Sequence, residues 1–156
     1  MALNELYLRT AFCCMACDGE IADEEVALLN KLALTEQVFG DLDIQMSINN
    51  YIESINKLGK VFLEEYLEDV RNACLDDSSS LQLVKIAIDT IEADNQVEYS
   101  EVSFFKRIRK QLSIKDEVIL EAMPDKEDYL LPDVETEVIF DWSFSFQSIQ
   151  LPELKA

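Results

Sequence analysis

The sequence has no histidine and far fewer basic than acidic residues. Among its 156 residues, 13 are Lys or Arg and 32 are Asp or Glu, so the net charge is −19. The absence of histidine removes the commonest general base and the usual catalytic triad, and any metal site must use carboxylates, carbonyls or thiolates. A chain this negative repels phosphate backbones and anionic lipid surfaces. We therefore expect no nucleic-acid partner.

Glycine and proline are also scarce, with three of each, and no proline precedes Pro124. A long stretch of helix formers with few breakers predicts helices. The longest apolar runs are shorter than the ~20 residues that a spanning helix needs, which argues against membrane insertion. The N-terminus has neither a basic start nor a long apolar run, so no export signal is visible. These features predict a soluble, cytoplasmic protein.

The apolar residues recur at helical spacing along most of the chain. Helices are predicted over residues 3–15, 26–33, 41–58, 60–75, 80–93, 99–112 and 113–123. Gly59 separates two of them, residues 76–80 are predicted to form a turn, and Ser113 with Asp116 has the pattern of a capping box. The predicted fold class is therefore all-α, a bundle of about six to seven helices in one domain over residues 1–123.

The segment 124–156 differs in character from this helical domain. From Val138 to Ser148, bulky apolar residues alternate with mostly polar ones, a period of two that predicts a strand. A lone strand cannot satisfy its own backbone groups. We therefore expect residues 124–156 to form a linker and an extended aromatic arm. The arm either covers the core of its own domain or pairs with a second copy or a partner protein.

Three of the four cysteines, Cys13, Cys14 and Cys17, lie close together at the end of the first predicted helix, and the fourth is Cys74. This is not the spacing of a disulfide framework. Cys14 and Cys17 match a C-x-x-C pattern, but there is no second such pair and no basic neighbour to activate a thiol. The pattern favours reduced thiols packed in the core over a zinc or redox site.

The chain contains an internal repeat in which residues 1–34 correspond to residues 80–112. Both halves read helix, acidic turn, helix, and share the pattern Asp-(Gly/Asn)-x-(Ile/Val)-x-x-x-Glu. This spacing equals the second half of an EF-hand loop, although the first half does not follow the EF-hand pattern in either repeat. The candidate ligands for a hard divalent cation (calcium, magnesium or manganese) are Asp18, Glu25, Asp94 and Glu101.

The same acidic residues also suit helix capping. Acids in the first turn of a helix stabilise the positive end of its dipole and cap its free N–H groups, which requires no metal. Between Asp18 and Glu25, however, the sequence places five carboxylates within eight residues, which is more mutual repulsion than capping alone explains. Metal binding and capping alone are therefore both interpretations of this pattern.

Two stretches carry the repeat, from Ala11 to Leu29 and from Ile86 to Ile108. They resemble the signature segments of the tellurite-resistance TerB-like family, and the resemblance covers residues 1–123. It implies a compact helical bundle with internal pseudo-two-fold symmetry and a role in bacterial stress and tellurite-resistance systems, with no established enzymatic activity. It also implies an acidic site for divalent metal, which falls on Asp18, Glu25, Asp94 and Glu101. Asn95 stands where the family has glycine, and the arm lies outside the resemblance.

Three functions remain open at this point. The first is a non-enzymatic TerB-like module that binds a divalent cation at its acidic turns and docks partner proteins. The second is a metal-free scaffold that forms a homodimer or other assembly through the aromatic strand. The third is a carboxylate-based enzyme, which would require one acid with a raised pKa in a cleft. The basic run 106–110 is typical of a helix C-terminus that pairs with acids, with an anion or partner patch as the alternative.

Overall fold

The structure is a computed structural model that describes residues 3–16, 23–36, 39–40, 43–93 and 99–130. Within these ranges the chain is helical and contains no strand, which confirms the all-α prediction. A π-helix, η1 (Leu32–Glu36), follows the second helix, and a 3-10 helix, η2 (Pro124–Tyr129), follows the last one. The α-helices of the described ranges are α1 (Leu3–Ala16), α2 (Asp23–Lys31), α3 (Ile44–Leu58), α4 (Lys60–Ala73), α5 (Asp77–Ile91), α6 (Tyr99–Lys110) and α7 (Asp116–Ala122).

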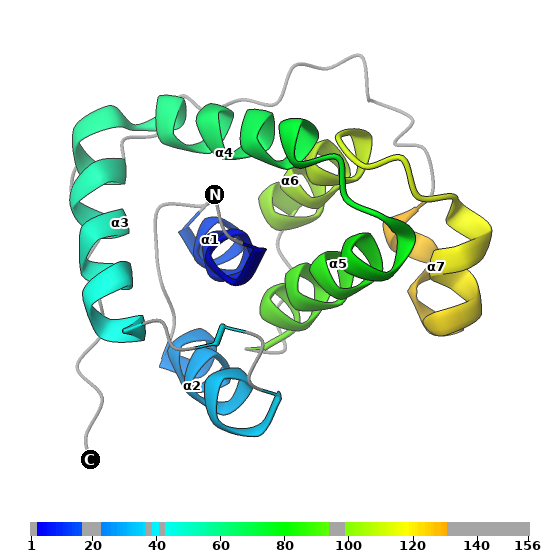
Figure 1. Ribbon diagram of the computed structural model, residues 1–156, viewed down its shortest axis with the longest axis horizontal. Coiled ribbons are helices and arrows are strands. Elements are labelled where there is room, and N and C mark those ends of the chain that lie inside the picture. Colours follow the sequence, from blue (N-terminus) through cyan, green and yellow to red (C-terminus); the bar gives the residue numbers. More distant parts are fainter. Residues whose placement is uncertain (1–2, 17–22, 37–38, 41–42, 94–98, 131–156) are drawn as a thin grey trace.

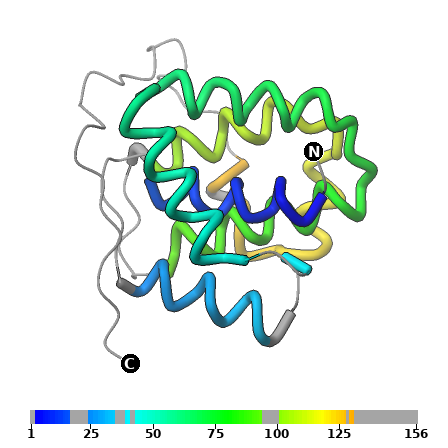
Figure 2. Tube along the Cα trace, turned by 60° about the vertical axis from the view of Figure 1, so that its left-hand side comes forward, coloured from blue at the N-terminus to red at the C-terminus, as the bar shows by residue number. Residues whose placement is uncertain are grey.

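Helix α1 forms the centre of the bundle. Figure 1 views it nearly along its axis, with α3, α4, α6, α5 and α2 arranged around it. Figure 2 shows α1 running through the middle, with α4 on one side and α2 on the other. From Leu6 to Ala16, every residue except Arg9 is buried. A helix that is apolar on all its faces has to be surrounded by others, and this explains its central place.

Aromatic rings attach α1 to α3 and α4. The ring of Phe12 lies 5.4 Å from that of Tyr51 and 5.7 Å from that of Phe62, measured between ring centroids. The guanidinium carbon of Arg9 is 5.4 Å from the centroids of both Tyr51 and Phe62, an arrangement that gives cation–π attraction. Nη1 of Arg9 also pairs with Oδ2 of Asp69 at 2.9 Å. The guanidinium of Arg9 therefore connects α1 with both α3 and α4.

The boundary between α3 and α4 follows the sequence prediction. Gly59 has φ 61°, a backbone conformation that residues with a side chain rarely adopt, and its N–H donates to Ile55 O. Helix α5, in contrast, begins three residues before the predicted position. Asp76 is its N-cap and accepts a hydrogen bond from the Ser79 N–H at 2.8 Å. The serines that the sequence predicts in a turn are therefore inside the first turn of the helix.

The capping box predicted at Ser113 is not formed. Helix α7 begins at Asp116 and its N-cap, Lys115, makes no side-chain cap. The Asp116 carboxylate instead pairs with Arg109, at 2.7 Å from Oδ1 to Nη2. Arg109 also donates to Leu112 O, so it ties the end of α6 to the start of α7. The prediction that basic residues of the run 106–110 pair with acids is confirmed for Arg109.

The core continues past residue 123. Tyr129, at the end of η2, is 8% exposed, and its ring packs edge-on against Phe105 of α6 at a centroid distance of 5.5 Å. The segment that follows Pro124 therefore begins as a packed part of the bundle. The aromatic alternation over residues 138–148, from which a strand was predicted, lies outside the described residues.

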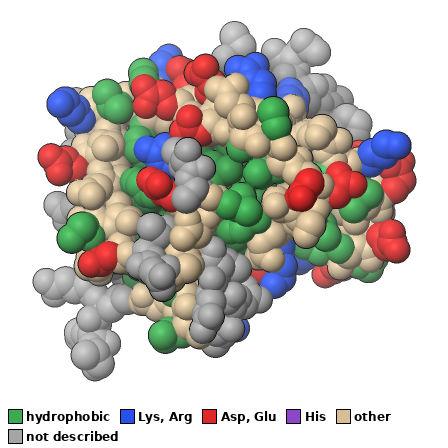
Figure 3. Space-filling model, viewed as in Figure 1, with side chains coloured by type: hydrophobic (Ala, Val, Ile, Leu, Met, Phe, Trp, Pro, Cys, Tyr) green, Lys and Arg blue, Asp and Glu red, His purple; other side chains and the backbone are tan. Residues whose placement is uncertain are grey.

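Charged and apolar side chains are unevenly distributed over the face of the molecule that Figure 3 shows. In Figure 3, hydrophobic side chains gather in the middle of the face seen in Figure 1, and most acidic and basic side chains lie towards its edges. The large hydrophobic residues that stay exposed in the described ranges are Leu3, Leu34, Met46, Leu58 and Val61. Single exposed apolar residues are normal on a protein surface, so they identify no site by themselves.

Candidate functional site

Two of the four predicted ligands lie in the described part of the chain. Glu25 is the third residue of α2 and Glu101 is the third residue of α6, so both occupy the same position in their repeats. Each is 4% exposed, which is unusual for a carboxylate. Asp18 and Asp94 lie outside the described residues. The repeat inferred from the sequence thus places one buried glutamate at the start of each second helix.

The position of these glutamates has a local explanation. The first N–H groups of a helix have no partner in the helix, and a glutamate at the third position can reach back to them. The positive end of the helix dipole favours the negative charge there. Glu25 and Glu101 both have interactions within the fold. Capping and the helix dipole alone would be sufficient reason for a glutamate at this position, without a metal.

Both glutamates also act electrostatically on one residue of α1. Cys14, in the last turn of α1, is fully buried, and burial raises the pKa of its thiol well above the ordinary value. The neighbouring Cys13 raises this pKa further, and the negative charges of Glu101 and Glu25 do so to a smaller extent. Both carboxylates therefore lie within electrostatic range of the Cys14 thiol. Because the C-terminal end of α1 also carries the negative pole of its dipole, three elements bring negative charge to one buried region.

This buried region suits a hard cation better than it suits nucleophilic chemistry. The raised pKa keeps the Cys14 thiol protonated at neutral pH, and a protonated thiol is a poor nucleophile and a poor metal ligand. Carboxylate oxygens are the ligands that calcium, magnesium and manganese prefer. Glu25 and Glu101 can supply two such groups. In the described ranges, no group of three or more Asp, Glu, Cys or His side chains is arranged to hold a metal ion.

Further ligands would therefore have to come from the segments 17–22 and 94–98, from backbone carbonyls or from water. Segment 17–22 contains Asp18 and segment 94–98 contains Asp94, and these are the acids that the shared pattern pairs with Glu25 and Glu101. Glu25 and Glu101 thus have the donor chemistry that a hard divalent cation prefers, and in the described ranges they supply two carboxylates and no complete ligand set.

Thr90 and Glu92 of the second repeat also carry oxygen atoms, but both side chains are bonded to other groups of the protein. Thr90 is buried, and its hydroxyl donates to Ile86 O one turn earlier, at 2.7 Å. Glu92 Oε1 pairs with Lys126 Nζ at 2.6 Å, and this hydrogen bond raises the pKa of Lys126. Sequence reasoning missed the pairing with Lys126 because the two residues are 34 positions apart. An isolated Lys between acids in the sequence carries no signal that selects one acid as its partner.

Two of the three described cysteines pack in the core, as the sequence predicts, and the third does not. Cys13 and Cys14 are buried, whereas Cys74 is exposed. Burial raises the pKa of the Cys13 thiol above its ordinary value as well. Cys17, the second cysteine of the C-x-x-C pattern, lies outside the described residues.

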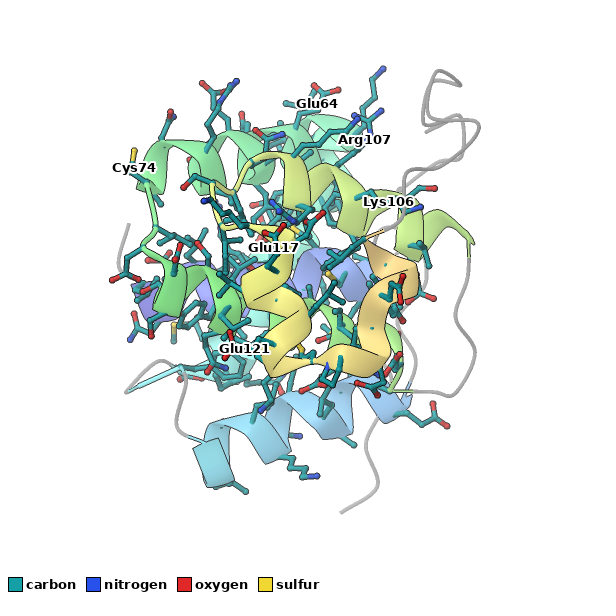
Figure 4. The ribbon with its side chains drawn as sticks, turned by 90° about the vertical axis from the view of Figure 1, so that its right-hand side faces the viewer. Glu64, Cys74, Lys106, Arg107, Glu117 and Glu121 are labelled. Atoms are coloured by element: carbon teal, nitrogen blue, oxygen red, sulfur yellow. The ribbon has the colours of Figure 1, made fainter. Side chains whose placement is uncertain are left out.

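The basic run on α6 is mixed with acids from neighbouring helices. Figure 4 shows Arg107 of α6 at the same edge of the molecule as Glu64 of α4, and it shows Glu117 and Glu121 along α7. Arg107 has an interaction partner within the fold. Together with the Arg109 pair described above, this arrangement favours the interpretation of the run as a helix end that pairs with acids.

Within the described ranges, every helix is too short or too polar to cross a lipid bilayer. No protein-family model, curated protein or solved structure is significantly similar to this chain.

Proposed function

We propose that this chain is a non-enzymatic, TerB-like helical module of the stress-response and tellurite-resistance type. Its two acidic turns bind one hard divalent cation between them, and its surface docks partner proteins. The observation that carries the cation proposal is that Glu25 and Glu101, at equivalent positions of the two repeats, are both almost fully buried carboxylates. The link to stress response and tellurite rests on the sequence resemblance alone.

Electrostatics supports a single shared cation over two separate ones. Like charges are unfavourable close to one another, and here two buried carboxylates act in the region of the negative end of α1. The net charge of −19 adds repulsion from the rest of the chain. One divalent cation placed between Glu25 and Glu101 would offset both charges. Asp18 and Asp94 would then complete the ligand set.

The test is a titration of the full chain with calcium, magnesium and manganese, followed by calorimetry and by the melting temperature. We expect heat with a stoichiometry of one cation, and stabilisation that reaches about 2.7 kcal/mol at a concentration 100 times the Kd. Zinc serves as a comparison, because the site offers hard oxygen donors and is not expected to prefer zinc. Absence of heat and of stabilisation at millimolar cation would refute the cation proposal.

Variants separate a shared site from two local caps. Glu25→Gln and Glu101→Gln should each abolish or strongly weaken binding of the single cation, and Asp18→Ala combined with Asp94→Ala should do the same. Glu24→Gln is the matched control, because Glu24 is the exposed neighbour of Glu25 and loses the same charge. An equal loss in Glu24→Gln would show that general charge, not the buried pair, determines the binding.

A metal-free scaffold that assembles through the aromatic strand is the alternative function. It is favoured by the alternation of bulky apolar residues over 138–148, a pattern suited to pairing with a second copy or a partner. Sedimentation of the full chain and of a chain ended after Leu130 decides this, since the shorter chain keeps Tyr129 in the core. A dimer that becomes a monomer on truncation supports it, and identical monomeric masses refute it.

A further inference from the structure

The end of η2 touches both helices that flank the second acidic turn. Tyr129 donates its hydroxyl to Glu92 Oε2 at 2.9 Å, and Glu92 is the C-cap of α5. The ring of the same tyrosine packs edge-on against Phe105 of α6, with 5.5 Å between the centroids. Lys126, from the same 3-10 helix, holds the other oxygen of Glu92 at 2.6 Å. One short segment thus connects the end of α5 with the first half of α6.

We propose that Glu92, Lys126 and Tyr129, which we call the Glu92 clamp, are positioning residues for Glu101. Phe105 follows Glu101 by four residues, so both side chains lie on the same face of α6. Tyr129 joins Phe105 to Glu92 at the end of α5 and so restricts the movement of α6. The position of Glu101 on α6 is restricted by the same contacts. The clamp acts on the half of the candidate cation site that the second repeat supplies.

The first repeat has no equivalent of this clamp in the described ranges. The residue that corresponds to Glu92 is Ala16, which is fully buried and has no side-chain group that could pair with a lysine or tyrosine. The residue that corresponds to Phe105 is Leu29. The two glutamates are therefore held in different ways, although the helices that carry them are related by the repeat. The clamp makes Glu101 the half of the site that depends on η2.

The three residues of the Glu92 clamp are partly or fully buried, and this strengthens the contacts that hold α6 in place. Tyr129 is 8% exposed, and the side chains of Lys126 and Glu92 are 20% and 35% exposed. A hydrogen bond to a charged acceptor in a partly buried place is stronger than one on an open surface. Both Glu92 oxygens are used, so loss of either partner leaves the carboxylate incompletely bonded in a partly dry environment.

The first test is amide hydrogen exchange on the full chain in wild-type protein and Tyr129→Phe. The variant keeps the ring and the net charge and removes only the hydroxyl that reaches Glu92. We expect exchange in the first turns of α6 to become about tenfold faster, while exchange in α2 stays unchanged. Tyr7→Phe is the matched control, because the Tyr7 hydroxyl donates to Ser79 O at the opposite end of α5. It should leave α6 unchanged.

Lys126 variants show whether the pairing itself is responsible. Lys126→Met should accelerate exchange in α6 as Tyr129→Phe does, and Lys126→Arg should restore the wild-type rate because it keeps a charged donor. Equal acceleration in α2 and α6, or no acceleration in either variant, would overturn the clamp. A general loss of stability would accelerate exchange in α2 as well, so faster exchange in α6 alone shows a local effect of the clamp.

The second test concerns the cation and rests on the proposed function. Calorimetry with calcium, magnesium and manganese compares wild type, Tyr129→Phe and Tyr7→Phe. We expect Tyr129→Phe to weaken cation binding severalfold, since a less fixed Glu101 is a poorer ligand, and Tyr7→Phe to leave binding unchanged. Equal binding by all three proteins would overturn the role of the clamp in positioning Glu101. If wild type binds no cation, the proposed function fails, and the exchange experiment still decides whether the clamp holds α6.

Discussion

Raising the pH from 7 to 10 under reducing conditions should destabilise this protein more than its surface charges alone would. Cys13, Cys14 and Tyr66 are all 0% exposed. Burial is the main cause that raises the pKa of each of them in the folded state. In the unfolded chain the same groups titrate near their ordinary pKa values, 9.0 for the thiols and 10.0 for the tyrosine. At a pH between the unfolded and the folded pKa of a group, that group loses its proton only in the unfolded state.

The sign and the size follow from proton linkage. A group with a raised folded pKa contributes its full stability below the unfolded pKa, and that stability is lost as the pH rises towards the folded pKa. At pH 10 each buried thiol therefore costs about 1.4 kcal/mol and Tyr66 costs about 0.4 kcal/mol. The combined loss of about 3 kcal/mol is a large part of the 5–15 kcal/mol that typically stabilises a domain.

Urea denaturation at pH 7, 8, 9 and 10, with reductant and followed by circular dichroism, measures this loss. Cys13→Ala and Cys14→Ala should each reduce the difference between pH 7 and pH 10 by about 1.4 kcal/mol. Cys74→Ala is the matched control, because the Cys74 side chain is exposed before and after unfolding. It should leave the difference unchanged. Because the chain has no histidine, stability should stay nearly constant from pH 6 to pH 8.

Thiolate absorbance of the folded protein provides the decisive check. Cys13 and Cys14 should not ionise below pH 10 while the protein is folded, so at most two of the four cysteines should titrate there. Titration of all four thiols near pH 9 in folded protein would refute the reasoning. A loss of unfolding free energy below about 1 kcal/mol at pH 10 would do so as well.

Three further substitutions test individual contacts by urea denaturation at pH 7. Tyr66→Phe should lower the free energy of unfolding by about 1 kcal/mol, because the Tyr66 hydroxyl lies 2.6 Å from Thr10 Oγ1 in the core; unchanged stability would contradict this. Asp43→Ala should cost about 1 kcal/mol, because Asp43 accepts from the Met46 N–H at the start of α3, whereas Asp43→Asn should keep most of that stability. Cys74→Gly should raise stability by about 0.5–1 kcal/mol, because Cys74 has φ 49°, and a loss would show that the left-handed backbone is not strained there.

Helices were the most predictable part of the fold because their signals are local. Periodic apolar residues and the lack of proline before residue 124 act over one or two turns, and α1, α3, α4 and α6 lie close to their predicted ranges. Helix starts were less predictable where two local signals compete. At α5 the Asp76 cap prevails over the turn preference of the serines that follow. At α7 a more distant group decides, because Arg109 pairs with Asp116.

The sequence by itself determined the chemistry that this protein can offer. With no histidine and with acids at repeated positions, it limits a metal site to hard oxygen donors, and it places Glu25 and Glu101 at the start of two helices. Those placements depend on spacing within one helix turn, which a single sequence displays directly.

Only the tertiary structure decided which side chains from distant parts of the sequence interact. Glu25 and Glu101 lie on different helices far apart in the chain, yet the charges of both act on Cys14 in the last turn of the buried helix α1. Lys126 and Tyr129 in η2 likewise reach Glu92 across more than 30 residues. Such contacts are set by how the whole core packs around α1, and local periodicity carries no information about them.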